Sequence, residues 1–255
     1  MSATPAAVRI VDVTLPVPGQ DHVARAWLVT EDDERWPRPG VLWLHWLGHR
    51  HNDRSEFLPL AVALASRGVV SLLPAGHFPW VPDPDGTATD VQRVRDQVDA
   101  HAAALDHLAA QPGVDPVRIA LVGHDYGAMY GVLLAERDDR ISTVALQAPD
   151  TCWENWFASY WLKLDDDPRK EYADLFADLE PVDAVARLAG RLADGMLLQW
   201  AGNDTFVTAE SGAAYVRANP QARSVSYDNA DHMLDDRAAL DLVAFLGDRL
   251  GLDQN

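Results

Sequence analysis

The sequence has few of the cysteines, positive charges and long apolar runs that are typical of proteins from oxidising compartments, of nucleic-acid-binding proteins and of membrane proteins. Cys152 is the only cysteine in 255 residues, which excludes an internal disulfide and favours a reducing compartment. The 21 Lys and Arg face 39 Asp and Glu, and this net charge of −18 opposes binding to phosphate backbones and anionic lipids. No apolar run approaches a membrane-spanning length, and no secretory signal is recognisable. We therefore expect a cytoplasmic protein with a small-molecule substrate, whereas a homo-oligomer stays possible.

Short apolar runs with strand character alternate with helical patterns along the chain. The predicted strands cover residues 8–13, 23–30, 40–46, 69–74, 118–122, 142–148, 195–202 and 224–227, of which the first two form a hairpin. Helical periodicity covers 55–67 and 89–108, where Thr89 or Asp90 is the expected cap. Such alternation is typical of an α/β fold, with a mainly parallel sheet and helices on both faces. No linker divides the sequence, so one domain is predicted over residues 1–255.

One motif joins a predicted strand to a predicted helix. The sequence GHDYGA, residues 123–128, follows the apolar run RIALV directly. A sharp turn between a strand and a helix needs small residues two positions either side of its central residue, because larger ones would crowd the backbone. Gly123 and Gly127 fill these positions around Asp125. The pattern therefore predicts that Asp125 lies at a sharp strand-to-helix turn, where many hydrolases carry a nucleophile.

The chain resembles the α/β-hydrolase family in this motif and in the order of later residues. In that family the catalytic acid and histidine follow the nucleophile, each after a later strand. The resemblance implies Asp204, in GNDTFV, as the acid and His232, in DNADHML, as the histidine. It also implies an oxyanion hole formed by the backbone N–H groups of Tyr126 and Leu47. In the turn HWLGHR, Trp46 takes the place of a usual glycine.

An aspartate in the nucleophile position changes the chemistry that is expected. With a reference pKa of about 3.9 it is ionised at neutral pH and needs no base to attack. Attack on an ester would give a high-energy anhydride, whereas attack on a saturated carbon gives an ordinary ester that the histidine can hydrolyse with water. Epoxide hydrolases and haloalkane dehalogenases are the α/β-hydrolases known for an aspartate nucleophile. We therefore expect epoxide opening by Asp125, with dehalogenation of a haloalkane or haloacid as an alternative.

Other features of the sequence leave further alternatives open. Both families usually place tryptophan after the nucleophile, where this chain has Tyr126, and both carry a large helical cap. Here the insertion is short, about residues 151–180, and the outline resembles the dienelactone hydrolases, which use cysteine or serine. An esterase of that type is a further alternative. A binding or cyclising scaffold, in which Asp125 acts only as an acid or base, is another.

Aromatic residues in the insertion fall at helical spacing and form a short lid over the site, or else pack on the body of the protein. Tyr160 is the expected proton donor for an epoxide oxygen, and Tyr172 is held in reserve. The loop with His77 is expected at the carboxyl edge of the sheet, where ligands bind in open α/β sheets. The predicted substrate pocket consists of Trp46, His77, Trp153, Trp156, Tyr160 and Trp161.

Histidines near the third predicted strand present a competing pattern. His49, His51 and Asp53 resemble the start of the metal motif of metallo-β-lactamase-like hydrolases, but Arg54 stands where that motif has histidine. A zinc site needs three or four converging ligands. We therefore predict no metal and no other cofactor. Of the other histidines, His101 and His107 are expected on the surface of the long helix. His124, beside Asp125, is expected to have a structural role.

Overall fold

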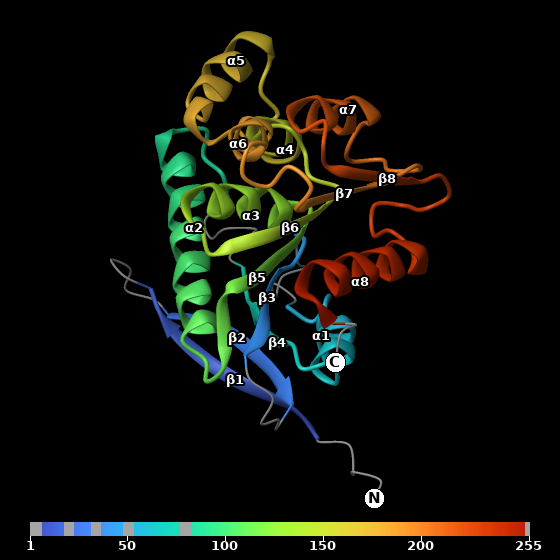
Figure 1. The fold of residues 1–255 in the computed structure, drawn as a ribbon. Helices are drawn as coiled ribbons and strands as arrows, with labels where there is room; N and C mark the ends of the chain where they lie inside the picture. The colour runs from blue at the N-terminus through green and yellow to red at the C-terminus, as the bar shows by residue number, and fades with distance from the viewer. Residues whose placement is uncertain (1–6, 18–22, 32–36, 48–53, 77–82, 253–255) are drawn as a thin grey trace, which may run out of the picture.

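The computed structural model describes residues 7–17, 23–31, 37–47, 54–76 and 83–252, and these residues build one eight-stranded sheet (Figure 1). The strand order is β1-β2-β4-β3-β5-β6-β7-β8. β1 and β2 form an antiparallel hairpin, β2 runs antiparallel to β4, and the other neighbours are parallel. The strands are β1 (Val8–Pro16), β2 (Val23–Glu31), β3 (Arg38–Leu44), β4 (Val70–Pro74), β5 (Val114–His124), β6 (Ile141–Gln147), β7 (Met196–Ala201) and β8 (Arg223–Tyr227). The predicted mainly parallel sheet and its opening hairpin are confirmed.

Helices cover both faces of the sheet, and a separate apolar core lies on each face (Figure 1). Strand β5 shows why its residues are apolar throughout: Ile119 and Leu121 point into one core, whereas Ala120 and Val122 point into the other. α1 (Leu58–Ala65) and α8 (Asp236–Leu250) cover one face; α2 (Ala88–Ala109), α3 (Tyr126–Arg137), α6 (Pro181–Leu188) and α7 (Ala209–Ala218) cover the other. Within the described ranges, no helix is both long and apolar enough to cross a membrane.

The long helix α2 differs from the prediction at its cap and on one face. Its cap is Thr87, whose hydroxyl accepts a hydrogen bond from the Thr89 N–H, rather than Thr89 or Asp90. The carboxylate of Asp90 is fully buried and accepts instead from the backbone N–H groups of residues 85 and 86. His101, predicted on the surface, is only 3 % exposed and meets the Tyr130 ring edge-on, because α3 packs over this face of α2. His107 is half-buried.

The aromatic insertion is broken into short helices. α4 (Trp153–Trp156) continues into a six-residue π-helix, η1 (Phe157–Leu162), which ends where Lys163 adopts a left-handed conformation with φ of 51°. α5 (Asp166–Asp174) and the 3₁₀ turn η2 (Ala177–Leu179) follow. Tyr172 of α5 donates a 2.7 Å hydrogen bond to Asp90 and so fixes the insertion to the start of α2. The insertion is therefore a series of short helices that Tyr172 anchors to the body of the protein.

We expect Tyr172→Phe to lower the free energy of unfolding by about 1.5–3 kcal/mol, because a hydrogen bond to a buried carboxylate is lost. Urea denaturation followed by tryptophan fluorescence measures the change. Tyr160→Phe is the matched control, since Tyr160 is 49 % exposed. Equal stability of the two variants would contradict the anchoring role of Tyr172.

Candidate active site

Asp125 lies at the turn between β5 and α3 in a conformation that non-glycine residues rarely adopt. Its φ is 53° and its ψ is −118°. A Cβ added at Gly123 would lie 2.4 Å from the carbonyl oxygen of Gly127, and one added at Gly127 would lie 2.0 Å from that of Leu44. Neither position has room for a side chain, which explains the glycine spacing found in the sequence. The strained turn holds the Asp125 carboxylate at the carboxyl end of β5.

We expect Gly127→Ala to destabilise the protein by about 3 kcal/mol or more, because the new methyl group meets rigid backbone at the turn. Gly190→Ala is the control, since a Cβ there meets no atom within 4 Å. Thermal unfolding of both variants measures the difference. A Gly127→Ala protein as stable as the control would show that the turn relaxes without cost.

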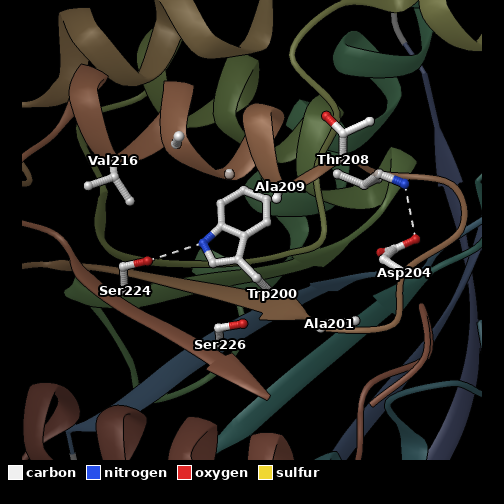
Figure 2. Close-up of a pocket in the computed structure, with 12 residues that line it drawn as sticks. Trp200, Ala201, Asp204, Thr208, Ala209, Val216, Ser224 and Ser226 are labelled. Carbon is white, nitrogen blue, oxygen red and sulfur yellow. Dashed lines mark hydrogen bonds between the residues drawn. The ribbon is translucent and has the colours of Figure 1, made fainter. Parts of the chain in front are cut away.

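His232 lies between two carboxylates. Its Nδ1 is 2.9 Å from Asp204 Oδ2, and its Nε2 is 3.8 Å from Asp125 Oδ2. The other oxygen of Asp204 accepts hydrogen bonds from the N–H groups of Phe206 and Val207, the second of which is drawn in Figure 2. The three side chains are 6 % exposed or less. The sequence predicted that His232 would contact Asp204 and face Asp125, and this geometry is found.

The two carboxylates determine the charge of the histidine. Burial by itself lowers the pKa of His232, but the hydrogen bond to Asp204 and the nearby carboxyl groups of Asp125 and Asp204 outweigh it and raise the pKa to about 9. Burial also acts to raise the pKa of Asp204, yet the hydrogen bonds from His232 and the two backbone N–H groups hold it below its usual value. At neutral pH the ring of His232 is therefore protonated and lies between the side chains of Asp125 and Asp204. Asp125 Oδ1 is buried and has no hydrogen-bond partner among the described residues.

This charge arrangement predicts a pH dependence of stability. Because folding raises the pKa of His232 from 6.5 to about 9, the stabilisation is complete below pH 6.5 and is lost as pH rises through about 9. The change is on the order of 3 kcal/mol for the full shift. Urea denaturation between pH 6 and 10 should show this loss in the wild type and not in His232→Gln. A parallel pH profile in both proteins would contradict it.

Leu47 donates its backbone N–H to Asp125 Oδ2 over 3.2 Å. The expected oxyanion-hole donor therefore already contacts one oxygen of the carboxylate. Tyr126, the other predicted donor, is the first residue of α3, as the turn requires. Its side chain is buried, with its ring 5.2 Å from that of Trp156. If Asp125 forms an ester, the oxygen on Leu47 becomes the ester carbonyl oxygen, where negative charge develops during hydrolysis.

The residues that were predicted to line the pocket lie in different positions relative to His232. The Trp156 ring lies 6.3 Å from that of His232, and Tyr160 stacks on Trp156 at 5.5 Å. Trp46 is half-buried beside His124, at 6.5 Å between ring centroids. Trp161 is half-buried and meets Tyr160 edge-on. The part of the segment near Trp156 thus lies beside His232.

The predicted roles of two residues in the insertion are wrong, and one further predicted pocket residue cannot be placed. Trp153 is fully buried in the core, where it packs on Tyr130 at 4.8 Å and donates its indole N–H to the Leu179 carbonyl oxygen. Tyr172 cannot serve as the reserve proton donor, because its hydroxyl is committed to Asp90. His77 lies outside the described residues.

Phe206 is a neighbour of the site that the sequence analysis missed. Its ring meets His232 edge-on at 5.1 Å and stacks on Trp156 at 6.1 Å, while 47 % of the residue stays exposed. It follows Asp204 by two positions in GNDTFV. This closeness to the predicted acid was the one feature of the sequence that could have placed Phe206 at the site. Phe206, Trp156 and Tyr160, here called the aromatic wall, extend outward from His232.

A depression lies next to Asp204, between α7 and the strands β7 and β8 (Figure 2). Its volume is about 540 Å³, and the indole of Trp200 forms its floor, with Nε1 donating to the Ser224 hydroxyl. Of the three candidate catalytic residues, Asp204 alone borders it. Among the described residues no group of three His, Cys, Asp or Glu side chains is arranged to hold a metal ion. The histidine-rich sequence with His49, His51 and Asp53 lies outside those residues.

Comparison with known proteins identifies the fold. No protein-family model and no curated protein sequence matches the chain. Among solved structures, it is similar to a putative dienelactone hydrolase from Klebsiella pneumoniae, with a TM-score of 0.67 and 15% identity over 94% of this chain and 99% of that one. It is also similar to Est1E from Butyrivibrio proteoclasticus, with a TM-score of 0.71 and 16% identity over 96% and 99% of the two chains.

The dienelactone hydrolase-like promiscuous phosphotriesterase P91, from metagenomic libraries, is similar at a TM-score of 0.66 and 17% identity, over 96% of this chain and 99% of that chain. These likenesses extend over nearly the whole chain but rest on few identical residues. They agree with the mixed eight-stranded sheet and its antiparallel β2. The chain therefore has the α/β-hydrolase fold.

Proposed function

We propose that the protein is a hydrolase in which Asp125 attacks an electrophilic carbon of a small molecule and His232 hydrolyses the resulting ester. The observation that carries this proposal is the position of the Asp125 carboxylate. It occupies the nucleophile turn, with Oδ2 3.2 Å from the Leu47 N–H and 3.8 Å from His232 Nε2. Asp204 supports the histidine from its other side. We further propose an epoxide as the substrate group, with a carbon–halogen bond as the alternative.

Two steps complete the proposed reaction. In the first, an Asp125 oxygen bonds to the substrate carbon while the bond from carbon to its leaving oxygen or halide breaks. In the second, His232 takes a proton from water, and the hydroxide adds to the Asp125 carboxyl carbon. The tetrahedral adduct then expels the alcohol, which receives a proton from His232, and the new carboxyl group of Asp125 gives its remaining proton to His232, which restores the carboxylate and the imidazolium. The Leu47 N–H is placed to stabilise the adduct's oxyanion.

The charge of His232 suits both steps. A protonated ring beside Asp125 can supply the proton that an opening epoxide oxygen needs, a task that the sequence analysis gave to Tyr160. Once Asp125 is an ester, it no longer carries the charge that helps to raise the pKa of His232 to about 9. The histidine then gives up its proton more readily and can act as the base. Tyr160, half-exposed behind Trp156, stays a second candidate donor.

The aromatic wall indicates the kind of substrate. Trp156 and Phe206 both pack against the His232 ring, so a molecule that reaches Asp125 passes apolar surface. A substrate carboxylate would meet Asp125 and Asp204 in a protein of net charge −18. We therefore propose a neutral substrate with an apolar or aromatic group.

An esterase of the dienelactone hydrolase type is the second candidate. It is favoured by the short insertion and by two of the similar solved structures, which are named as a putative dienelactone hydrolase and a dienelactone hydrolase-like phosphotriesterase and give no support to epoxide opening in particular. In this reading Asp125 and His232 activate water directly, because attack by a carboxylate on an ester would give an anhydride.

A reactive-probe panel tests the proposal. Wild-type protein is incubated with styrene oxide, 1-chlorohexane and 4-nitrophenyl butyrate, and the products are measured by chromatography. The proposal expects hydrolysis of styrene oxide or 1-chlorohexane and loss of that activity in Asp125→Asn. Hydrolysis of the butyrate ester alone would favour the esterase. No turnover of any probe, together with no mass added to the protein, would contradict the proposed chemistry.

A further inference from the structure

Two residues outside the candidate triad connect the two loops that reach Asp125. His124 is 1 % exposed, and its Nδ1 lies 2.6 Å from Glu56 Oε1. The other Glu56 oxygen, Oε2, accepts a 2.8 Å hydrogen bond from the backbone N–H of Trp46. On its far side, His124 Nε2 lies 2.9 Å from the backbone carbonyl oxygen of His232. Glu56 and His124 thus bridge the Trp46 loop and the His232 loop beneath Asp125.

The protons in this bridge follow from the chemistry of its atoms. A carbonyl oxygen can only accept, so His124 Nε2 must carry a proton and donate it to His232. Nδ1 then shares a second proton with Glu56, either as an imidazolium facing a carboxylate or as a neutral ring facing a carboxylic acid. The pair is electrically neutral in both cases. Such a short contact between a buried ring and a part-buried carboxyl group is strong and directional.

The bridge bears on catalytic geometry because each loop supplies one contact to Asp125 Oδ2. Leu47, directly after Trp46, donates its N–H to this oxygen, and the His232 ring faces it at 3.8 Å. The rings of His124 and His232 also lie 5.0 Å apart, so movement of one displaces the other.

We infer that Glu56 and His124 are positioning residues that fix the distances from Asp125 to the Leu47 N–H and to the His232 ring. They touch neither the Asp125 carboxylate nor the reacting atoms and act through the backbone of Trp46 and His232. Glutamine at position 56 can keep both contacts, since its oxygen accepts from Trp46 and its amide donates to a neutral His124. Alanine keeps neither. The two hydrogen bonds of residue 56, more than its charge, therefore fix the positions of Trp46 and His124.

The test uses Glu56→Ala and Glu56→Gln, with Glu136→Ala as the control that removes a surface pair to Arg187. The first measurement is the titration of His232 by ¹⁵N NMR, which needs no substrate. We expect Glu56→Ala to shift its pKa downward by at least half a unit, because the ring moves away from Asp125. Glu56→Gln and Glu136→Ala should keep the wild-type titration. An unchanged His232 titration in Glu56→Ala would overturn the inference.

The second measurement is kinetic and rests on the proposed function. With the probe that the wild type hydrolyses, Glu56→Ala should lower kcat about 100-fold with KM within about twofold, since small misplacements of reacting groups cost rate more than binding. Rescue by Glu56→Gln to within about fivefold supports positioning; a glutamine variant as slow as alanine overturns it. Lack of turnover in the wild type would count against the proposed function alone, because the NMR titration still decides. If Glu56→Ala does not fold, His124→Asn replaces it in both measurements.

Discussion

His232→Gln is expected to stop the second half of the reaction, in which water loses its base. The carboxylate of Asp125 needs no activation and a departing chloride needs no proton, so attack on 1-chlorohexane continues. Attack on styrene oxide loses the proton donor assigned to His232 and continues only where Tyr160 supplies the proton. General-base loss costs about 10²–10⁴-fold in rate. The protein should therefore accumulate an adduct of one probe molecule, visible by intact mass and located on Asp125 by peptide mapping.

His107→Gln is the matched control for this variant, because His107 lies near the end of α2 and is a half-buried histidine away from the site. It should turn over the probe as the wild type does and hold no adduct. An inactive His232→Gln protein that gains no mass from 1-chlorohexane would indicate that His232 is required before or during the attack. That result would favour Asp125 and His232 acting together on water.

Asp125→Asn is expected to remove turnover and adduct formation together. The amide is not nucleophilic, so the rate should fall by about 10⁵–10⁶-fold, the scale on which loss of a covalent nucleophile acts. The shape of the side chain is kept, and Leu47 can still donate to an amide oxygen. The pKa of His232 should also fall below about 9 in this variant, since one of the two carboxylates that raise it is gone.

Asp99→Asn controls for the loss of a negative charge, because Asp99 pairs with Arg137 on the surface. Its activity and its His232 titration should match the wild type. The Asp125→Asn sample must be checked by peptide mass, since hydrolysis of the amide restores aspartate. Activity that persists in verified Asp125→Asn protein would show that the carboxylate is not the nucleophile.

Much of the fold was predictable because the signals are local. Continuous apolar runs in β5 and its neighbours predict strands with two buried faces, and the glycines around Asp125 predict the strained turn. The cap of α2 was not predictable in the same way. Asp90 has the composition of a cap, but its carboxylate is used by the preceding loop and by Tyr172, a residue far away in sequence. Contacts of that kind depend on the tertiary structure.

The same distinction applies to the site. The order Asp125, Asp204, His232 follows from the strands that precede each residue, and their mutual geometry could be predicted from it. The separation of Trp153 from Trp156 could not, because both fall at helical spacing and only the packing of α4 decides which ring enters the core. Glu56 carries no motif at all. Its role depends on contacts with Trp46 and His124, which the fold brings together.

A single turnover in ¹⁸O-water tests most directly whether Asp125 bonds to the substrate. The enzyme is mixed in excess with the probe that the wild type hydrolyses, and the reaction is quenched after one turnover. The product and the Asp125 peptide are then analysed by mass. Hydrolysis of an aspartyl ester at its carboxyl carbon should place ¹⁸O in Asp125 and leave the first product unlabelled. Label in the product together with unlabelled Asp125 would contradict the covalent mechanism and show that water attacks the substrate directly.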